Sequence, residues 1–170
     1  MKILAIPGSL RAGSINHSLL DTAKRLAPQD VEVAIFKGIG EIPLFNPDDD
    51  NDPSPFAVGA FRAAIAAADA ILISSPEYAR GVPGALKNAL DWLVSDHRVA
   101  GKTVAMINAA SGGGKDVTEQ LALILTTMAA KVIFAASLVG AHVRQNDPIV
   151  EKTVQESLDT MIAASRRPHE

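Results

Sequence analysis

Five short apolar runs, each followed by a stretch with helical spacing, divide the chain into repeated units. The runs cover residues 3–6, 31–36, 69–74, 103–108 and 131–139. Their apolar residues do not alternate with polar ones, so each run is expected to be a strand buried on both faces. Strands of this kind that alternate with helices form a parallel sheet with helices on both sides.

Helical patterns complete this fold class. Apolar residues at spacings of three and four predict helices over residues 19–27, 56–68, 86–93, 121–128 and 150–161, with Pro83 at the start of the third. Five such β-α units without a break in composition predict one domain over residues 1–170. We expect a flavodoxin-like three-layer α/β/α sandwich with a five-stranded parallel sheet of order 2-1-3-4-5.

Ligand chemistry in this fold is expected at one end of the sheet. Ligands bind beyond the carboxyl ends of the strands, where the winding direction reverses between the first and third strands. The loops predicted at those ends cover residues 7–18, 37–55, 75–82 and 109–116, and they are the segments richest in glycine, proline and polar residues. Fold class and loop composition therefore indicate the same edge.

Composition argues against several classes of partner. The formal net charge is −3, and lysine and arginine are scattered along the chain, which disfavours nucleic acid. The chain has no cysteine, which removes disulfides and thiolate chemistry. No apolar run reaches the roughly 20 residues that span a bilayer, and the first strand starts too early for a signal peptide. A cytoplasmic protein without membrane insertion is therefore expected.

Metal binding is not expected either. Asp48, Asp50 and Asp52 have the spacing of a calcium loop. However, Pro53 stands in place of the glycine and Gly59 in place of the bidentate acid, so a solvated acidic loop is expected. The four histidines also lack the spacing of metal ligands: His17, His97, His142 and His169.

The loop after the first strand suits a phosphate. Amide groups and the dipole of the following helix attract anions, and Arg11 adds a full charge with a planar fork of donors. Ser14 directly follows Gly13, so the lysine of a nucleoside-triphosphate loop is missing, as is the G-x-G-x-x-G of dinucleotide sites. A monophosphate site remains, and a plain strand-to-helix turn capped by Asn16 is the alternative.

Two motifs give the chain a family resemblance. Residues 8–11 read Gly-Ser-Leu-Arg, and Ser14 and Asn16 follow. Residues 76–78 then read Pro-Glu-Tyr, and residues 82–92 read Val-Pro-Gly-Ala-Leu-Lys-Asn-Ala-Leu-Asp-Trp. In this order the motifs resemble those of the NADPH-dependent FMN reductase family, which has a flavodoxin-like fold and includes quinone, chromate and azo-dye reductases. The resemblance extends over nearly the whole chain.

The resemblance implies a flavin site made of three loops. The first would hold the FMN phosphate through the side chains and amides of Ser9, Leu10, Arg11, Ser14, Ile15 and Asn16. The second would border the isoalloxazine ring, mainly through backbone groups, with Pro76, Glu77, Tyr78, Ala79, Arg80 and Gly81. The third would approach the flat ring with Ser111, Gly112 and Gly113, since glycine leaves room there. NADPH or NADH would be the reductant, and no catalytic side chain is implied because the chemistry takes place at flavin N5.

Some positions depart from the usual family pattern. The family commonly has asparagine and serine where this chain has Ala79 and Gly81, so polar side chains near the ring edge are lost. After the glycine loop, Lys115 and Asp116 stand where a small residue and arginine are common. Two roles are open for Arg80, a contact with the phosphate of the nicotinamide cofactor or simple solvation.

The leading hypothesis is an FMN-dependent NAD(P)H oxidoreductase that passes electrons to a quinone-like or other small acceptor. The alternative is a flavodoxin-like electron carrier or flavin-binding module without NAD(P)H turnover, which the lost polar side chains favour. A nucleotide-binding regulator without flavin is a third hypothesis. The resemblance also implies a homodimer or homotetramer, and Trp92 either faces a subunit partner or packs in the core.

Overall fold

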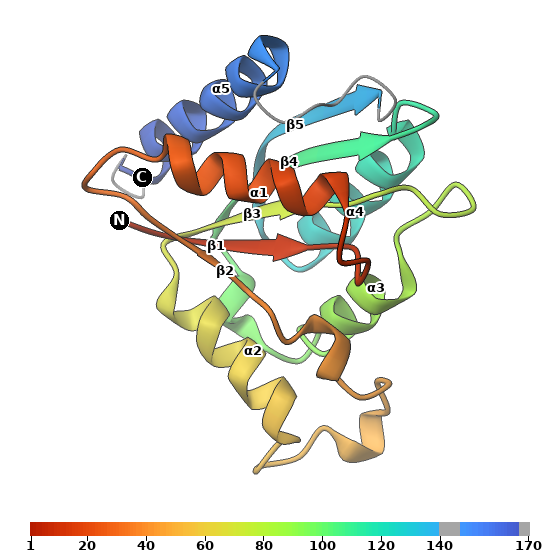
Figure 1. The fold of residues 1–170 in the computed structure, drawn as a ribbon. Helices are drawn as coiled ribbons and strands as arrows, with labels where there is room; N and C mark the ends of the chain where they lie inside the picture. The colour runs from red at the N-terminus through yellow and green to blue at the C-terminus, as the bar shows by residue number, and fades with distance from the viewer. Residues whose placement is uncertain (140–146, 167–170) are drawn as a thin grey trace.

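The structure, a computed structural model, describes residues 1–139 and 147–166. Within these ranges, five parallel strands form one sheet in the order β2-β1-β3-β4-β5 (Figure 1). Their bounds are β1 Lys2–Pro7, β2 Glu32–Ile35, β3 Ala70–Ser74, β4 Thr103–Ala110 and β5 Lys131–Val139. The predicted fold class and strand order are confirmed, and the winding direction reverses between β1 and β3.

Helices cover both faces of this sheet (Figure 1). On one face lie α1 (Ile15–Leu26) and α5 (Pro148–Ser165), and on the other lie α2 (Phe56–Ala67), α3 (Gly84–Asp91) and α4 (Lys115–Thr127). Three short 3₁₀ helices complete the described secondary structure: η1 Ile39–Glu41, η2 Pro47–Asp49 and η3 His97–Val99. Every helix in the described part of the chain is too short or too polar to cross a membrane.

The strands send apolar side chains into both layers. Along β3, Ile71 and Ile73 pack beneath α2, α3 and α4, whereas Ala70 and Leu72 pack beneath α1 and α5. All four side chains are buried. A strand buried on both faces needs apolar residues at every position, which explains why the apolar runs show no alternation.

The predicted apolar faces of the helices point into these two cores. The helical side chains that are buried there include Leu19, Leu20, Ala23, Phe61, Ile65, Leu86, Ala89, Leu90, Leu121, Leu125, Val154, Leu158 and Met161. Most of the free energy that holds each helix to the sheet therefore comes from apolar area removed from water, at about 25 cal/mol per Å².

Trp92 packs within its own chain. Its side chain is fully buried, and its ring contacts Phe45 edge to face with ring centroids 5.1 Å apart. The indole Nε1 donates a hydrogen bond to the carbonyl oxygen of Pro43 at 2.9 Å. Of the two interpretations of Trp92, core packing is therefore correct.

The predicted boundaries differ from the observed ones at polar helix starts and at small residues. α1 begins at Ile15, before the predicted start at residue 19, because its first turn is polar and carries no apolar pattern. β4 continues to Ala110, where a loop was predicted, because Ala109 and Ala110 pair with β5. β5 has an irregularity opposite Val104 and Ala105. His142 and His169 lie outside the described residues.

Candidate functional site

Three loops meet beyond the carboxyl ends of β1, β3 and β4, at the end to which the strand arrows point in Figure 1. They cover residues 8–14, 75–83 and 111–114. The amide of Gly8 donates to the carbonyl oxygen of Ser74 at 2.8 Å, which joins the start of the first loop to the end of β3, directly before the second loop. A Cβ at position 8 would lie only 2.5 Å from Ser75 Oγ, so this approach requires glycine.

The first loop leaves several donors unused by the protein itself. Ser14 is the N-cap residue of α1, but its side chain makes no capping hydrogen bond. Among the described residues, the amides of Ile15 and Asn16 have no acceptor. Arg11 is exposed at the turn, and its amide donates to Ser9 Oγ at 3.2 Å. Unused donors and an exposed guanidinium at a helix start fit an external anion.

The side chain of Asn16 points into the protein. It is only 3% exposed, and its Nδ2 donates to the carbonyl oxygen of Ala109 at 2.9 Å. Its Oδ1 accepts from the amide of Ala109 at 2.8 Å and from Ser74 Oγ at 3.0 Å. The alternative of a turn capped by Asn16 is therefore wrong. One Nδ2 hydrogen is the only side-chain donor left for the phosphate contact that the resemblance implies.

Asn108 near the end of β4 is a site residue that the motifs did not indicate. Its side chain is fully buried, its Oδ1 accepts from the amide of Ser75 at 3.0 Å, and its Nδ2 donates to Thr118 Oγ1 at 2.9 Å. It therefore fixes the second loop to α4. The signal in the sequence was an amide side chain within an apolar strand, since a buried amide needs partners.

Glu77 caps α4 from the second loop. The N-cap residue of α4 is Gly114, which has no side chain to cap the helix. Instead, Glu77 Oε2 accepts from the amide of Val117 at 3.1 Å. The carboxylate lies where the helix dipole favours a negative charge. This bond engages Oε2 alone, so Oε1 faces the third loop near Gly112 and can still accept a hydrogen bond.

Residues 78–81 form a tight hairpin at the tip of the second loop. The amide of Tyr78 donates to the carbonyl oxygen of Gly81 at 3.1 Å, and the reverse bond is 2.9 Å long. Ala79 and Arg80, with φ angles of 49° and 60°, are both left-handed. Glycine and asparagine adopt this conformation readily, whereas alanine and arginine pay a steric cost. The asparagine that is usual at position 79 would suit this backbone.

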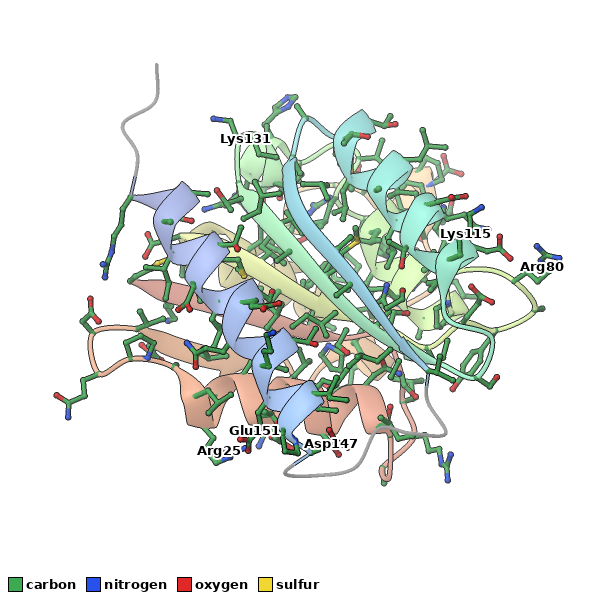
Figure 2. All side chains as sticks on the ribbon, turned by 90° about the horizontal axis from the view of Figure 1, so that it is seen from above. Arg25, Arg80, Lys115, Lys131, Asp147 and Glu151 are labelled. Atoms are coloured by element: carbon green, nitrogen blue, oxygen red, sulfur yellow. The ribbon has the colours of Figure 1, made fainter. Side chains whose placement is uncertain are left out.

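α4 holds the hairpin in place. Gln120 Nε2 donates to the carbonyl oxygen of Arg80 at 2.8 Å, and Gln120 Oε1 accepts from the amide of Val82 at 3.3 Å. Arg80 Nε donates to Asp116 Oδ2 at 2.7 Å, and this bond lowers the pKa of the Asp116 carboxyl. Figure 2 shows Arg80 at the hairpin tip beside the start of α4, where Lys115 is labelled. Neither role considered for Arg80 included this ion pair.

The third loop presents backbone rather than side chains. Gly113 and Gly114 have positive φ angles of 87° and 66°, which favour glycine. Gly112 has no such requirement, and a Cβ there would meet nothing closer than Glu77 Oε1 at 3.8 Å. Glycine at position 112 is therefore not needed for folding, and it leaves bare backbone beside the other loops.

The structure thus brings the expected site residues of the three loops to one end of the sheet. Tyr78 links two of these loops, because its hydroxyl lies 3.4 Å from Ser9 Oγ. Leu10, Ile15, Ala79 and Ser111 are exposed there. His17 is half-buried in the first turn of α1.

The acidic loop has a structural role through one of its residues. Asp50 accepts hydrogen bonds from Arg62 Nη2 at 2.9 Å and from the hydroxyl of Ser95, and the Ser95 bond lowers the pKa of the Asp50 carboxyl. Arg62 also donates to the carbonyl oxygen of Trp92 at 2.6 Å. The expectation of a solvated loop is therefore wrong for Asp50, while Asp48 and its neighbour Asp49 are exposed.

Comparison with known proteins connects this geometry to a family. The model of the family described as NADPH-dependent FMN reductase matches residues 1–144. The quinone reductase of Escherichia coli (strain K12) is 33% identical over 162 residues, which are 92% of this chain and 86% of that protein. The 2-hydroxy-1,4-benzoquinone reductase of a Burkholderia species is 47% identical over 92 residues, 54% of this chain and 49% of that protein.

Solved structures share the fold. The flavoenzyme NAD(P)H:(acceptor) oxidoreductase of Paracoccus denitrificans superposes with a TM-score of 0.76 at 25% identity, over 95% of this chain and 97% of that one. RosB, solved with a bound 8-demethyl-8-formylriboflavin-5'-phosphate, gives a TM-score of 0.77 over 98% of this chain and 79% of its own. Its identity is only 15%, so that likeness concerns the fold alone.

Proposed function

The chain belongs to the NADPH-dependent FMN reductase family, and on that premise we propose that it passes hydride or electrons from NAD(P)H through FMN to quinone-like or other small acceptors. Relatives that are named for quinone and FMN reduction support this proposal. The observation that carries it is the meeting of three loops with unused donors and bare glycine backbone at the topological switch point.

FMN fits the residues that are present. Arg11, with the hydroxyls of Ser9 and Ser14 and the amides at the start of α1, would hold the phosphate. The backbone of residues 76–81 and of 111–113 would border the ring, because the glycine at position 112 leaves bare backbone there and the bond of Glu77 to α4 holds the second loop in place. The chemistry supplied by bound FMN is hydride acceptance and electron transfer.

The side chains of this chain bind and orient in that reaction. Arg11 neutralises the phosphate, and Asn108 with Glu77 fixes the loop that borders the ring. Because the cofactor carries the chemistry, no side-chain acid or base is needed. One open ring face would serve reductant and acceptor in turn, so ping-pong kinetics are expected.

The loss of polar side chains at positions 79 and 81 gives little support to an electron carrier. Gln120 bonds the hairpin at both the carbonyl oxygen of Arg80 and the amide of Val82, so the hairpin is held by polar contacts from α4 instead. Low NAD(P)H oxidation together with bound FMN would favour the carrier over the reductase.

A homodimer or homotetramer is part of the proposal. Leu44, Phe56 and Val94 are 85%, 91% and 66% exposed; Leu44 lies between η1 and η2, Phe56 begins α2, and Val94 follows α3. Apolar side chains that are this exposed suit an interface between subunits. Light scattering after size-exclusion chromatography measures the mass, and a monomer would count against this part. The cytoplasm, which holds the NAD(P)H pool, is the proposed compartment.

The visible spectrum of purified protein tests the central claim. We expect the absorbance of an oxidised flavin, which NADPH bleaches and a quinone restores. Protein that stays colourless with added FMN, and that does not oxidise NADPH in the presence of a quinone, would overturn the proposal.

A further inference from the structure

The hydrogen bonds between β3 and β4 end before β4 does. Residue pairs between these strands run as far as Ile73 and Met106, but β4 continues to Ala110 and keeps its pairing with β5. Ala109 is only 4% exposed, so its amide and carbonyl need partners on the side where β3 no longer pairs.

The side chain of Asn16 supplies these partners. Its amide group bonds both the N–H and the C=O of Ala109, at 2.8 and 2.9 Å, as the peptide group of a neighbouring strand would. Its oxygen also accepts from the hydroxyl of Ser74, the last residue of β3, at 3.0 Å. Asn16 itself lies in the first turn of α1, directly after the phosphate loop. One buried side chain thus joins the end of the first loop to the strand residues that precede the other two loops.

We propose that Asn16 is a positioning residue that fixes the phosphate loop to β3 and β4, so that the three flavin loops are held as one unit. The proposal rests on the flavin site proposed above. The proposal gives Asn16 a role different from those of Arg11 and Ser14, because the hydrogen bonds of the Asn16 side chain are made to other groups of the protein. Loss of Asn16 should therefore disturb the ring end of the site as much as the phosphate end.

Binding of FMN and of riboflavin, which lacks the phosphate, separates these roles. Asn16→Ala should weaken the binding of both flavins, that of FMN at least as much as that of riboflavin, and shift the visible absorption bands of bound flavin. Arg11→Ala is the matched control, and it should weaken FMN binding while it leaves riboflavin binding unchanged. If Asn16→Ala behaves like Arg11→Ala, or changes neither affinity, the proposal is wrong.

Asn16→Asp adds a test that a general loss of stability would not imitate. A protonated carboxyl has the shape of the amide and can donate to the carbonyl oxygen of Ala109, whereas a carboxylate can only accept. Burial raises the pKa of such a carboxyl. The riboflavin affinity of Asn16→Asp, divided by that of the native protein, should rise as the pH falls. The same ratio for Asn16→Ala should not rise. The absence of recovery would contradict the proposal.

Other ionisable groups are common to all variants in this comparison. The contacts of Asn16 from β3 and β4 are the Ser74 hydroxyl and the Ala109 backbone, which do not titrate. The ionisable groups on the neighbouring elements include His17, Asp21, Lys24 and Arg25 on α1, Arg11, Glu77, Tyr78 and Arg80 in the loops, Lys115, Asp116 and Glu119 on α4, Asp147 at the N-cap of α5, and Glu151, Lys152, Glu156 and Asp159 on α5. Dividing the riboflavin affinity of each variant by that of the native protein at the same pH therefore removes the effect of these groups.

Folding of each variant is checked by circular dichroism. If Asn16→Ala does not fold, Ser74→Ala takes its place. It removes one of the three hydrogen bonds of the Asn16 side chain and should weaken the binding of both flavins by a smaller factor than the loss of all three. Equal riboflavin binding by Ser74→Ala and native protein would then contradict the proposal. If the native protein binds neither flavin, the proposed function fails; if it binds both and the variants spare riboflavin, only the role of Asn16 fails.

Discussion

Arg80 and Asp116 form an ion pair that joins the hairpin of the second loop to the first turn of α4. The Nε of Arg80 lies 2.7 Å from Oδ2 of Asp116, and the two residues are 36 positions apart. Considered alone, Arg80 is a cation with no evident role, and Asp116 carries the opposite charge to the arginine that is common at its position. Taken together, the two changes compensate, so that the hairpin presents no net charge from this pair.

Replacing Asp116 by asparagine should free the guanidinium of Arg80 at the rim of the site. We expect the KM for NADPH to fall relative to that for NADH, because only NADPH carries the additional phosphate. Arg80→Gln in the same background is the control and should cancel the change. An unaltered ratio of the two KM values would show that Arg80 does not meet the reductant.

The same ion pair predicts a pH range in which the ratio of the KM values for NADPH and NADH is constant. The pKa of Asp116 is lowered by the hydrogen bond from Arg80, so the pair is intact above the ordinary aspartate pKa of 3.8 and is lost as the pH falls through the lowered value. The KM ratio of the native protein should therefore be constant between about pH 7 and 8, above the second pKa of about 6 of a phosphate monoester. A change within that range, measured by steady-state kinetics, would assign the titration to another group.

Arg11→Ala should weaken FMN binding by about 1.5–3 kcal/mol, the usual range for hydrogen bonds to charged groups. This corresponds to a factor of about 10 to 150 in the dissociation constant. Quenching of flavin fluorescence during titration measures it. Arg11→Lys keeps the positive charge but loses the planar fork of donors, so its FMN affinity should lie between those of the native protein and Arg11→Ala. An unchanged dissociation constant for Arg11→Ala would remove Arg11 from the site.

Ser157→Ala should stabilise the protein. Ser157 lies on the buried face of α5, and its hydroxyl has no hydrogen-bond partner among the described residues. Removal of an unsatisfied buried hydroxyl and the better helix propensity of alanine should together raise the free energy of unfolding by about 1 kcal/mol. Urea denaturation measures this change, and a decrease would indicate that the hydroxyl has a partner.

The general fold follows from features that sequence reports directly. Apolar runs without alternation require a sheet covered on both faces, and side chains such as Ile71 and Leu72 fill both layers. Helical spacing identified the face of α5 that packs against the sheet, including Val154 and Leu158. Loop composition predicted the edge at which the three loops of the candidate site meet, since the glycine and polar residues gather where the strands end.

The orientation of polar side chains could not be predicted in the same way. Nothing in the sequence indicates that Asn16 turns inward to the backbone of Ala109 rather than outward. The ion pair of Arg80 with Asp116 depends on the tertiary fold, because it joins a hairpin to a helix. Ala109 read as loop because small residues carry little strand preference, although pairing with β5 extends the strand through it.

Asp50 should contribute to stability at neutral pH and lose that contribution in acid. The hydrogen bond from Ser95 lowers its pKa from 3.8, so its stabilisation is present above 3.8 and disappears as the pH falls through the lowered value. Asp50→Asn should therefore reduce the melting temperature at pH 7 and flatten its decline below about pH 4. Asp48→Asn, in the same loop but exposed, is the control. Equal acid profiles for both variants would contradict this role.

Ala129→Gly should stabilise the C-terminal end of α4. Ala129 follows the C-cap residue Met128 and has a φ of 60°, and the amide of Ala130 donates to the carbonyl oxygen of Leu125 at 3.0 Å. This is the position at which helices favour glycine, because a Cβ in the left-handed region costs about 1–2 kcal/mol. The greater freedom of glycine in the unfolded chain offsets part of the gain, so the net increase should be about 0.5–1 kcal/mol. Ala129→Val should decrease stability, and neither variant should change FMN affinity, because the site lies at the other end of the helix. A loss of stability in Ala129→Gly would show that the left-handed alanine is not strained.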